Sequence, residues 1–442
     1  MHWNIPSLLL PLLFVPTTIT TAFFSPISKR HYQTKYSTAL NSNMDASSLL
    51  VVGLNAALQK RFILPSNTDL IPGDVHRATS IQQGVGGKGQ DVLITLSCLQ
   101  SKTLDTKKKI SIAQFIGQGP EGDNVLSLLR QHSFDDSFTI RTESGIRTCT
   151  TIVATEYSTE LVEPSGVIEP EELSDLLTKV EQSDVNALCI MGSMPPGCPA
   201  DTYANILKNM ISSSSDEEDD KSYYCLIDSV IGLDELLQEL NDGRSKLKNK
   251  LNAVLKINIS ELSKLGGASD AITSDELTEQ EKVSKVVISF LSTFSNAQSA
   301  LDYIAITAGK DPAYLVQLDS DKESTDVIQC LYKLAIPNLT QSHPDQTLYP
   351  IGAGDSVASG TLAAWLELVT SSESSNSILD SDIQSTILSA KKSYGDNVDD
   401  FACAFAFGLA CGSASCLQEQ NSVLDQEDVK KIFTDMPAPA AL

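Results

Sequence analysis

The sequence predicts an α/β fold with a mostly parallel central sheet. Short apolar runs alternate with segments of helical periodicity from residue 48 onward, which is the pattern of strand–helix–strand units. Several of the runs, such as residues 187–191, are apolar throughout. Such runs are typical of strands that are covered on both faces.

Each element follows from its own stretch of sequence. The apolar runs predict strands at residues 49–54, 110–116, 150–154, 187–191, 224–227, 253–257 and 303–307. Helical spacing of apolar residues predicts helices at residues 88–99, 123–131, 169–180, 200–211, 355–368 and 400–414. The segment 139–154 alternates in polarity, which indicates a small antiparallel element.

The charge balance excludes a general nucleic-acid binder. The 442 residues include 32 Lys and Arg against 56 Asp and Glu, a net charge of −24, whereas nucleic acids require a basic face. Much of the acidity lies near residues 212–221, 266–283 and 370–400, three polar stretches that look inserted and that we expect to be surface loops. Anionic small ligands stay possible, because a few fixed cations in a cleft can reverse the local field.

Residues 1–44 differ from the rest, since no Asp or Glu precedes Asp45. The apolar run at 5–15 is too short to cross a bilayer and is typical of a signal peptide. After Ala22, a Phe-led stretch rich in Ser and Thr and free of acids continues to Met44. The whole resembles a bipartite plastid presequence, a signal followed by a transit peptide. It predicts a mature protein at 45–442 in the chloroplast stroma, with the secretory pathway or the cytoplasm as alternatives.

The cysteine pattern favours a reducing compartment. Nine cysteines lie mostly inside apolar runs and show no CxxC spacing. This is typical of buried free thiols rather than of a disulfide framework or a zinc site. No stretch after the presequence is apolar and long enough for a transmembrane helix.

The most informative motif is Ile-Gly-Ala-Gly-Asp-Ser at 351–356, directly before a predicted helix. Small residues allow a ligand to approach the backbone, and the free amides of a helix N-terminus bind anions such as phosphate. Asp355 in the first turn can accept a proton from a substrate hydroxyl. The alternative is a plain helix cap.

A second glycine-rich stretch, at 84–91, also precedes a predicted helix. Its Gly-Gly-Lys-Gly sequence can place amides and one cation near an oxyanion. It lacks the spacing of a Walker A loop, so by itself it is weak evidence.

Together these motifs resemble the ribokinase/PfkB family of carbohydrate kinases, most closely its branch of 1-phosphofructokinase and tagatose-6-phosphate kinase. Gly-Gly-Lys-Gly at 86–89 matches the family's first signature, and Gly-Ala-Gly-Asp at 352–355 matches its second. Between them, segments at 147–150, 159–164, 192–197 and 256–261 match further motifs of that branch in family order. The resemblance implies a three-layer αβα sandwich with a small β-lid, formed near residues 55–85 and 139–165, that closes over the sugar.

The resemblance also implies roles for individual residues. Asp355 would be the catalytic base, and the anion hole would consist of Gly352, Ala353 and Gly354. The sugar would be held by Asn55, Gln59, Gly86, Gly87, Lys88 and Asp91. A phosphate already on the substrate would be contacted by Arg77 and Arg147.

On the nucleotide side, the resemblance implies ATP and Mg²⁺ as cofactors. The ATP-binding positions would be Lys256, Asn258, Glu261, Thr307, Gly309 and Gly408. Of these, Asn258 and Glu261 would also organise Mg²⁺, mainly through water and phosphate.

Two departures fall on the sugar side. Gln59 stands where the branch usually has Asp, and Asp91 stands where the family usually has Asn. The expected activity is ATP-dependent phosphorylation of a sugar phosphate. The alternatives are a kinase of an unphosphorylated sugar or nucleoside, or a catalytically weak scaffold subunit in the plastid. The expected partners are the small-molecule substrates alone, without nucleic acid or, in the mature form, membrane. The resemblance also implies a homodimer that pairs through the β-lid.

Overall fold

The computed structural model describes residues 48–101, 110–132, 134–154, 158–212, 221–248, 250–319, 327–344, 346–370 and 377–442. The predicted presequence at 1–44 lies outside these residues. Among the helices that are described, none has the length and apolar character needed to cross a membrane.

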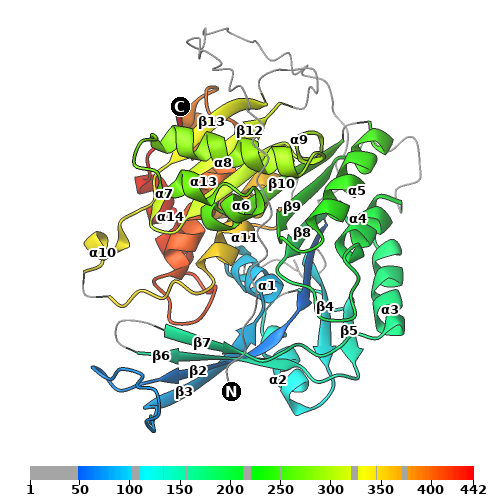
Figure 1. Ribbon diagram of the computed structural model, residues 1–442, viewed down its shortest axis with the longest axis vertical. Coiled ribbons are helices and arrows are strands. Elements are labelled where there is room, and N and C mark those ends of the chain that lie inside the picture. Colours follow the sequence, from blue (N-terminus) through cyan, green and yellow to red (C-terminus); the bar gives the residue numbers. More distant parts are fainter. Residues whose placement is uncertain are drawn as a thin grey trace, which may run out of the picture. The chain divides into compact units, whose positions relative to one another are not determined.

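A ten-stranded sheet forms the centre of the fold, in the order β14-β13-β12-β11-β10-β9-β8-β1-β4-β5 (Figure 1). All neighbouring strands from β5 to β11 pair in parallel, and those from β11 to β14 pair antiparallel. The parallel strands are β1 (Leu49–Asn55), β4 (Ile110–Gly117), β5 (Thr139–Thr142), β8 (Ala187–Met191), β9 (Tyr223–Asp228), β10 (Leu251–Asn258) and β11 (Tyr303–Ala308). The remaining strands are β12 (Asp311–Leu318), β13 (Ile328–Leu334) and β14 (Ala440–Ala441).

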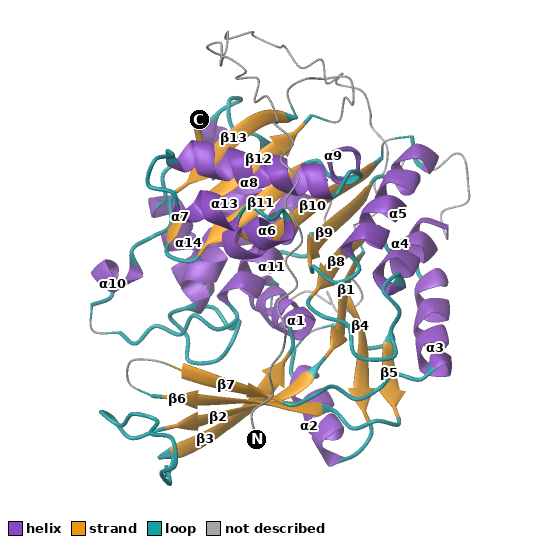
Figure 2. Cartoon of the chain, in the orientation of Figure 1, coloured by secondary structure: helices purple, strands orange, loops and turns teal. Residues whose placement is uncertain are grey.

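Helices cover both faces of this sheet (Figure 2). Alternate residues of β1 enter different cores, Leu49 and Val51 on one side and Leu50 and Val52 on the other. The first core is closed by α1 (Lys88–Leu99), α2 (Pro120–Leu129), α10 (Leu339–Ser342), α11 (Ala353–Val369), α12 (Ser381–Tyr394), α13 (Asp400–Ser415) and α14 (Gln426–Asp435). The second is closed by α3 (Pro170–Glu181), α4 (Thr202–Ser212), α5 (Leu233–Lys246), α6 (Ile259–Leu265), α7 (Ser269–Thr273), α8 (Glu279–Thr293) and α9 (Ala297–Ala300). The predicted three-layer αβα architecture is confirmed.

A second, four-stranded sheet has the order β3-β2-β6-β7. Its strands are β2 (Ala57–Ile63), β3 (Ser80–Gly86), β6 (Arg147–Val153) and β7 (Ser158–Val162). The segment 139–154 does not form one antiparallel element as expected. Residues Thr139–Thr142 join the large sheet beside β4. Strand β6 pairs with β2 in parallel and with β7 antiparallel, so only the second half of the segment has the expected antiparallel pairing.

Two of the three acidic stretches, expected to be surface loops, contain helices in their described residues. The stretch 266–283 contains α7 and the start of α8, where Thr278 and Glu281 form a capping box. The stretch 370–400 contains α12, whose Asp380 caps the first turn and whose Ile383 is buried. Caps and buried apolar positions outweigh the acidic composition there. In the third stretch, residues 213–220 lie outside the described part of the chain.

Candidate active site

A cavity of about 460 Å³ opens where parallel strands of the large sheet end. The carboxyl edge of a parallel sheet is the usual place for a ligand, because loops leave a crevice there. The small sheet forms the facing wall. The lining includes Asn55, Met191, Asp228 and Ile257 from β1, β8, β9 and β10, and Gln59, Cys149 and Glu160 from β2, β6 and β7.

The start of α11 forms one end of the cavity. Gly352 has a φ of 85°, and a side chain there would collide with the Ser422 hydroxyl, so only glycine fits. The side chain of Lys256 also lies against this turn, since a Cβ on Gly354 would be 3.3 Å from its Nζ. Free amides and an ammonium group together favour an anion, as the Gly-rich motif predicts.

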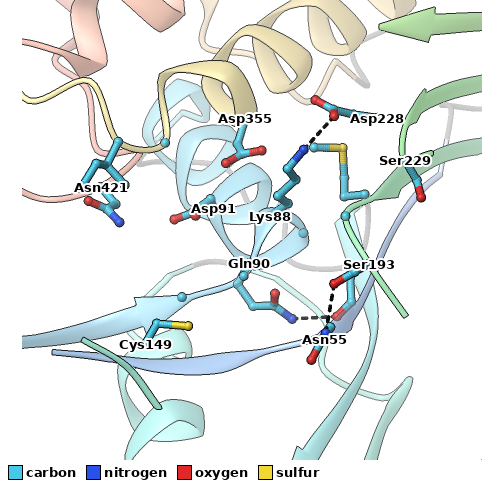
Figure 3. Close-up of a pocket in the computed structure, with 18 of the residues that line it drawn as sticks. Asn55, Lys88, Gln90, Asp91, Cys149, Ser193, Asp228, Ser229, Asp355 and Asn421 are labelled. Carbon is cyan, nitrogen blue, oxygen red and sulfur yellow. Dashed lines mark hydrogen bonds and ion pairs between the residues drawn. The ribbon is translucent and has the colours of Figure 1, made fainter. Parts of the chain in front are cut away.

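Asp355 follows this turn directly, lines the cavity and is 9% exposed. Figure 3 shows its carboxylate in the same space as the side chains of Asp91 and Lys88. Burial and the charge of Asp228 raise the pKa of Asp355 to about 7, against the opposing effect of Lys88 and Lys256. A carboxylate with a pKa near the working pH is suited to accept a proton and release it again.

Asp228 links the two lysines of the site. Its two carboxylate oxygens accept from Lys88 Nζ at 3.0 Å and from Lys256 Nζ at 2.6 Å. Burial alone would raise the pKa of Asp228, but the two ammonium groups hold it below its usual value. The two lysine side chains are therefore held on either side of a buried carboxylate.

The residues expected on the sugar side that line the cavity include Gln59, Gly87 and Asp91 beside Lys88. Gln59 donates to Thr151 Oγ1 at 2.6 Å, and Gly87, with a φ of 116°, starts α1. Asp91 is buried, and its Oδ1 has no protein partner. Burial, with the charge of Asp355, raises the pKa of Asp91 well above its usual range. A ligand that donates hydrogen bonds would satisfy this carboxyl group.

The expected nucleotide residues lie at adjacent strand ends. Asn258 ends β10 and caps α6, where its Oδ1 accepts from Glu261 N at 2.8 Å. Its register partner on β11 is Thr307. Glu261 lines the cavity, whereas Asn258 and Thr307 lie just outside it. Gly309, exposed and with a φ of 66°, lies in the turn between β11 and β12.

Arg77 and Gly408, like Gly309, do not line the cavity. Arg77 is exposed in the connection between β2 and β3. Gly408 is buried where α13 crosses α11, and a Cβ there would collide with Thr361. Arg147, by contrast, lines the cavity and donates from Nη2 to Asn55 O at 2.9 Å.

Sequence reasoning missed Asp228, Ser193 and Asn421, all of which line the cavity. Asp228 had a usable signal, because it comes directly after the apolar run at 224–227. A polar residue at the end of a buried parallel strand lies at the ligand-binding edge of the sheet. Ser193 lies in the matched segment 192–197 but was not singled out, whereas Asn421 belongs to a connecting segment without such a signal.

A glycine-rich helix start with a buried carboxyl group beside it, at the edge of a parallel sheet, is compatible with phosphoryl transfer to an alcohol. The profile of the pfkB family carbohydrate kinases matches residues 57–425. The chain therefore belongs to the PfkB family of carbohydrate kinases, as its motifs predict.

Solved structures share the fold at low sequence identity. Phosphofructokinase-2 from Escherichia coli, crystallised with potassium, has a TM-score of 0.59 and 18% identity, covering 88% of this chain and 98% of its own. Ribokinase from Giardia lamblia has a TM-score of 0.60 and 14% identity, covering 88% and 99%. A possible 1-phosphofructokinase from Thermotoga maritima has a TM-score of 0.56 and 16% identity, covering 89% and 99%. All three support the ribokinase-like fold.

Proposed function

We propose that the protein transfers the terminal phosphoryl group of ATP to a hydroxyl of a sugar phosphate, with Asp355 as the base. The observation that carries this proposal is the position of Asp355. It is a buried carboxyl group with a pKa of about 7, directly after the anion-binding turn at Gly352.

Positioning and charge perform most of this reaction, because phosphoryl transfer needs little covalent work from the protein. The small sheet and the start of α1 hold the sugar, with Gln59 and Asp91 against its hydroxyls. Asp355 accepts the proton of the attacking hydroxyl. The amides of the Gly352 turn, with Lys256, stabilise the charge on the transferred group.

The residues present fit a Mg²⁺ ion that is held largely by phosphate and water. The described residues contain no group of three or more His, Cys, Asp or Glu side chains that could cage a metal. Mg²⁺ in kinases typically uses only one or two carboxylates beside the phosphates, and Glu261 lines the cavity next to the Asn258 cap. When bound, the ion would neutralise charge on the ATP phosphates.

The rate should depend on pH through Asp355. The base acts only when ionised, so kcat/KM should rise with pH, reach half its plateau near pH 7 and then level off. The measurement is a pH series of initial rates at saturating Mg²⁺. A plateau that extends unchanged down to pH 5 would contradict the assignment of this pKa to the base.

Arg147 is the candidate for contact with a phosphate on the substrate. Its Nε is buried without a protein partner, so it has a donor to spare at the cavity. The structure of phosphofructokinase-2 from Escherichia coli with fructose 6-phosphate makes a hexose phosphate the first substrate to test.

Arg147→Ala should lower kcat/KM for a sugar phosphate by about 10–100-fold and for the free sugar much less, because a charge-assisted hydrogen bond is lost only with the former. The assay compares fructose 1-phosphate, fructose 6-phosphate and tagatose 6-phosphate with fructose. Arg130→Ala, at a surface ion pair with Asp136, is the matched control. Equal losses on phosphorylated and free sugars would contradict this role.

One observation favours a second candidate, a kinase of an unphosphorylated sugar or nucleoside. Of the two arginines expected at a substrate phosphate, only Arg147 lines the cavity. An ADP-release screen across sugars, sugar phosphates and nucleosides separates the two. Retained ATP binding without any turnover would instead support the scaffold subunit.

Two further proposals concern the oligomeric state and the localisation of the protein. Ile81 and Leu161, on the small sheet, are more than half exposed, which favours a homodimer through this sheet. Plastid import remains a proposal from the sequence of residues 1–44.

A further inference from the structure

Arg61 reaches from the small sheet to a distant part of the chain. It lies on β2 and is 6% exposed. Its two terminal nitrogens donate to the backbone carbonyl of Glu419 and to the side-chain carbonyl of Asn421. Gln82 on β3 adds a hydrogen bond to Glu419 Oε1 at 2.5 Å. The small sheet is thus hydrogen-bonded to Glu419 and Asn421 in the 419–422 segment, the middle of the connection between α13 and α14.

The same 419–422 segment also holds the anion-binding turn. The Ser422 hydroxyl donates to Gly352 O at 3.2 Å. The Ser422 carbonyl accepts from Thr95 Oγ1 of α1 at 2.8 Å, and Thr95 Oγ1 lies 2.9 Å from Ser356 Oγ of α11. Asn421 itself lines the cavity. Arg61 is therefore connected to Gly352 and Ser356, on either side of Gly354, through hydrogen bonds and the covalent link between Asn421 and Ser422.

The backbone at Ser422 shows that this segment is held under constraint. Ser422 is fully buried and has a φ of 58°, a left-handed conformation that residues other than glycine adopt at a cost. Such a conformation persists only where the surrounding contacts fix it. Burying the Arg61 guanidinium is also unfavourable, and it lowers the pKa of Arg61. Two energetically unfavourable features, the buried Arg61 guanidinium and the left-handed backbone of Ser422, therefore meet at the 419–422 segment.

We propose that Arg61 is a positioning residue that couples the seating of the small sheet over the cavity to the shape of the phosphate-binding turn at Gly352, acting through the 419–422 segment. Arg61 does not line the cavity that holds Asp355, so it acts through Asn421 and Ser422. The inference rests on the proposed function. Its chemical consequence is that the anion-binding turn is correctly shaped only when the sugar side is closed, which limits transfer to water.

The test uses the purified full chain with Arg61→Ala, Arg61→Lys, Asn421→Ala and the double variant Arg61→Ala/Asn421→Ala. Lys60→Ala is the matched control, because Lys60 is the neighbouring cation on β2 and faces the opposite side of the strand. Arg61→Ala should lower kcat about 10-fold and raise the ratio of acceptor-free ATP hydrolysis to sugar phosphorylation. Arg61→Lys should restore little, because an ammonium cannot bond both acceptors as the guanidinium fork does.

The effects of Arg61→Ala and Asn421→Ala on kcat should not be additive. The double variant should be no worse than the worse single variant, because both changes break the same connection. Effects on kcat that multiply, or a Lys60→Ala variant that behaves like Arg61→Ala, would overturn the proposal.

Hydrogen exchange separates this proposal from the proposed function, because it needs no substrate. In the ligand-free protein, Arg61→Ala should speed amide exchange at residues 419–423 and also at 352–356. Faster exchange confined to the small sheet would overturn the coupling whatever the activity. Faster exchange at both segments, in a protein that phosphorylates nothing, would leave the coupling standing and overturn the kinase proposal alone.

Discussion

Asp355→Asn is expected to lower kcat by about 10²–10⁴-fold, the usual contribution of a positioned general base. The amide keeps the shape of the carboxylate but cannot accept the proton of the attacking hydroxyl. Because the pKa of Asp355 is raised to about 7, the wild-type base ionises within the neutral range, and the variant should show no such ionisation in its residual rate.

The measurement is a coupled assay of ADP release, together with ATP affinity and thermal unfolding. Unchanged ATP affinity and stability would separate lost chemistry from lost structure. Asp382→Asn is the control, since Asp382 also lies in the first turn of a helix but is exposed on α12. Turnover comparable to the wild type in Asp355→Asn would reject the base.

Asp228→Asn should have the second-largest effect, acting on both stability and pH dependence. Removing one partner of a buried ion pair costs about 3–5 kcal/mol, since the other charge stays buried. Lys256, only 6% exposed in its side chain, would lose its counter-ion. Asp228 also raises the pKa of Asp355. Without its negative charge that pKa falls, so the acid limb of the kcat/KM profile should move below pH 7.

Denaturant unfolding and a pH series of rates measure the two effects. Asp184→Asn is the matched control, because Asp184 pairs with Lys221 at 2.5 Å but is 97% exposed, and exposed pairs contribute little. An acid limb that stays in place or moves to higher pH would show that Asp228 does not set the pKa of the base.

The central layer of the fold could be predicted because strands that are buried on both faces are continuous apolar runs in the sequence. The strand at Ala187–Met191 and the helix at Lys88–Leu99 have the predicted bounds. The small sheet was harder to delimit, since its strands alternate around polar residues such as Gln82 and Lys60. The strand Thr139–Thr142 belongs to the large sheet because it pairs with β4, and no local sequence pattern encodes that pairing.

The candidate site divides in the same way. The Gly352 turn and Asp355 could be predicted, because a Gly-rich motif before a helix has a local meaning. The ion pairs of Asp228 could not, because its partners lie 140 and 28 positions away. Arg61 gave no signal for the same reason, since its contacts with residues 419–421 span more than 350 positions. Such contacts exist only once the fold is assembled.

Because α11 and α13 are closely packed, substitutions far from the cavity lining can alter the position of the start of α11. Gly408 and Gly412 let the two helices approach until backbone nearly meets backbone, and a methyl group at Gly412 would press on Ala353, the first residue of α11. A bulkier residue at these positions of α13 would therefore tilt or shift the helix whose first turn carries Asp355. Variants with poor turnover can thus arise in an apolar interior contact, where a survey restricted to cavity residues would never look.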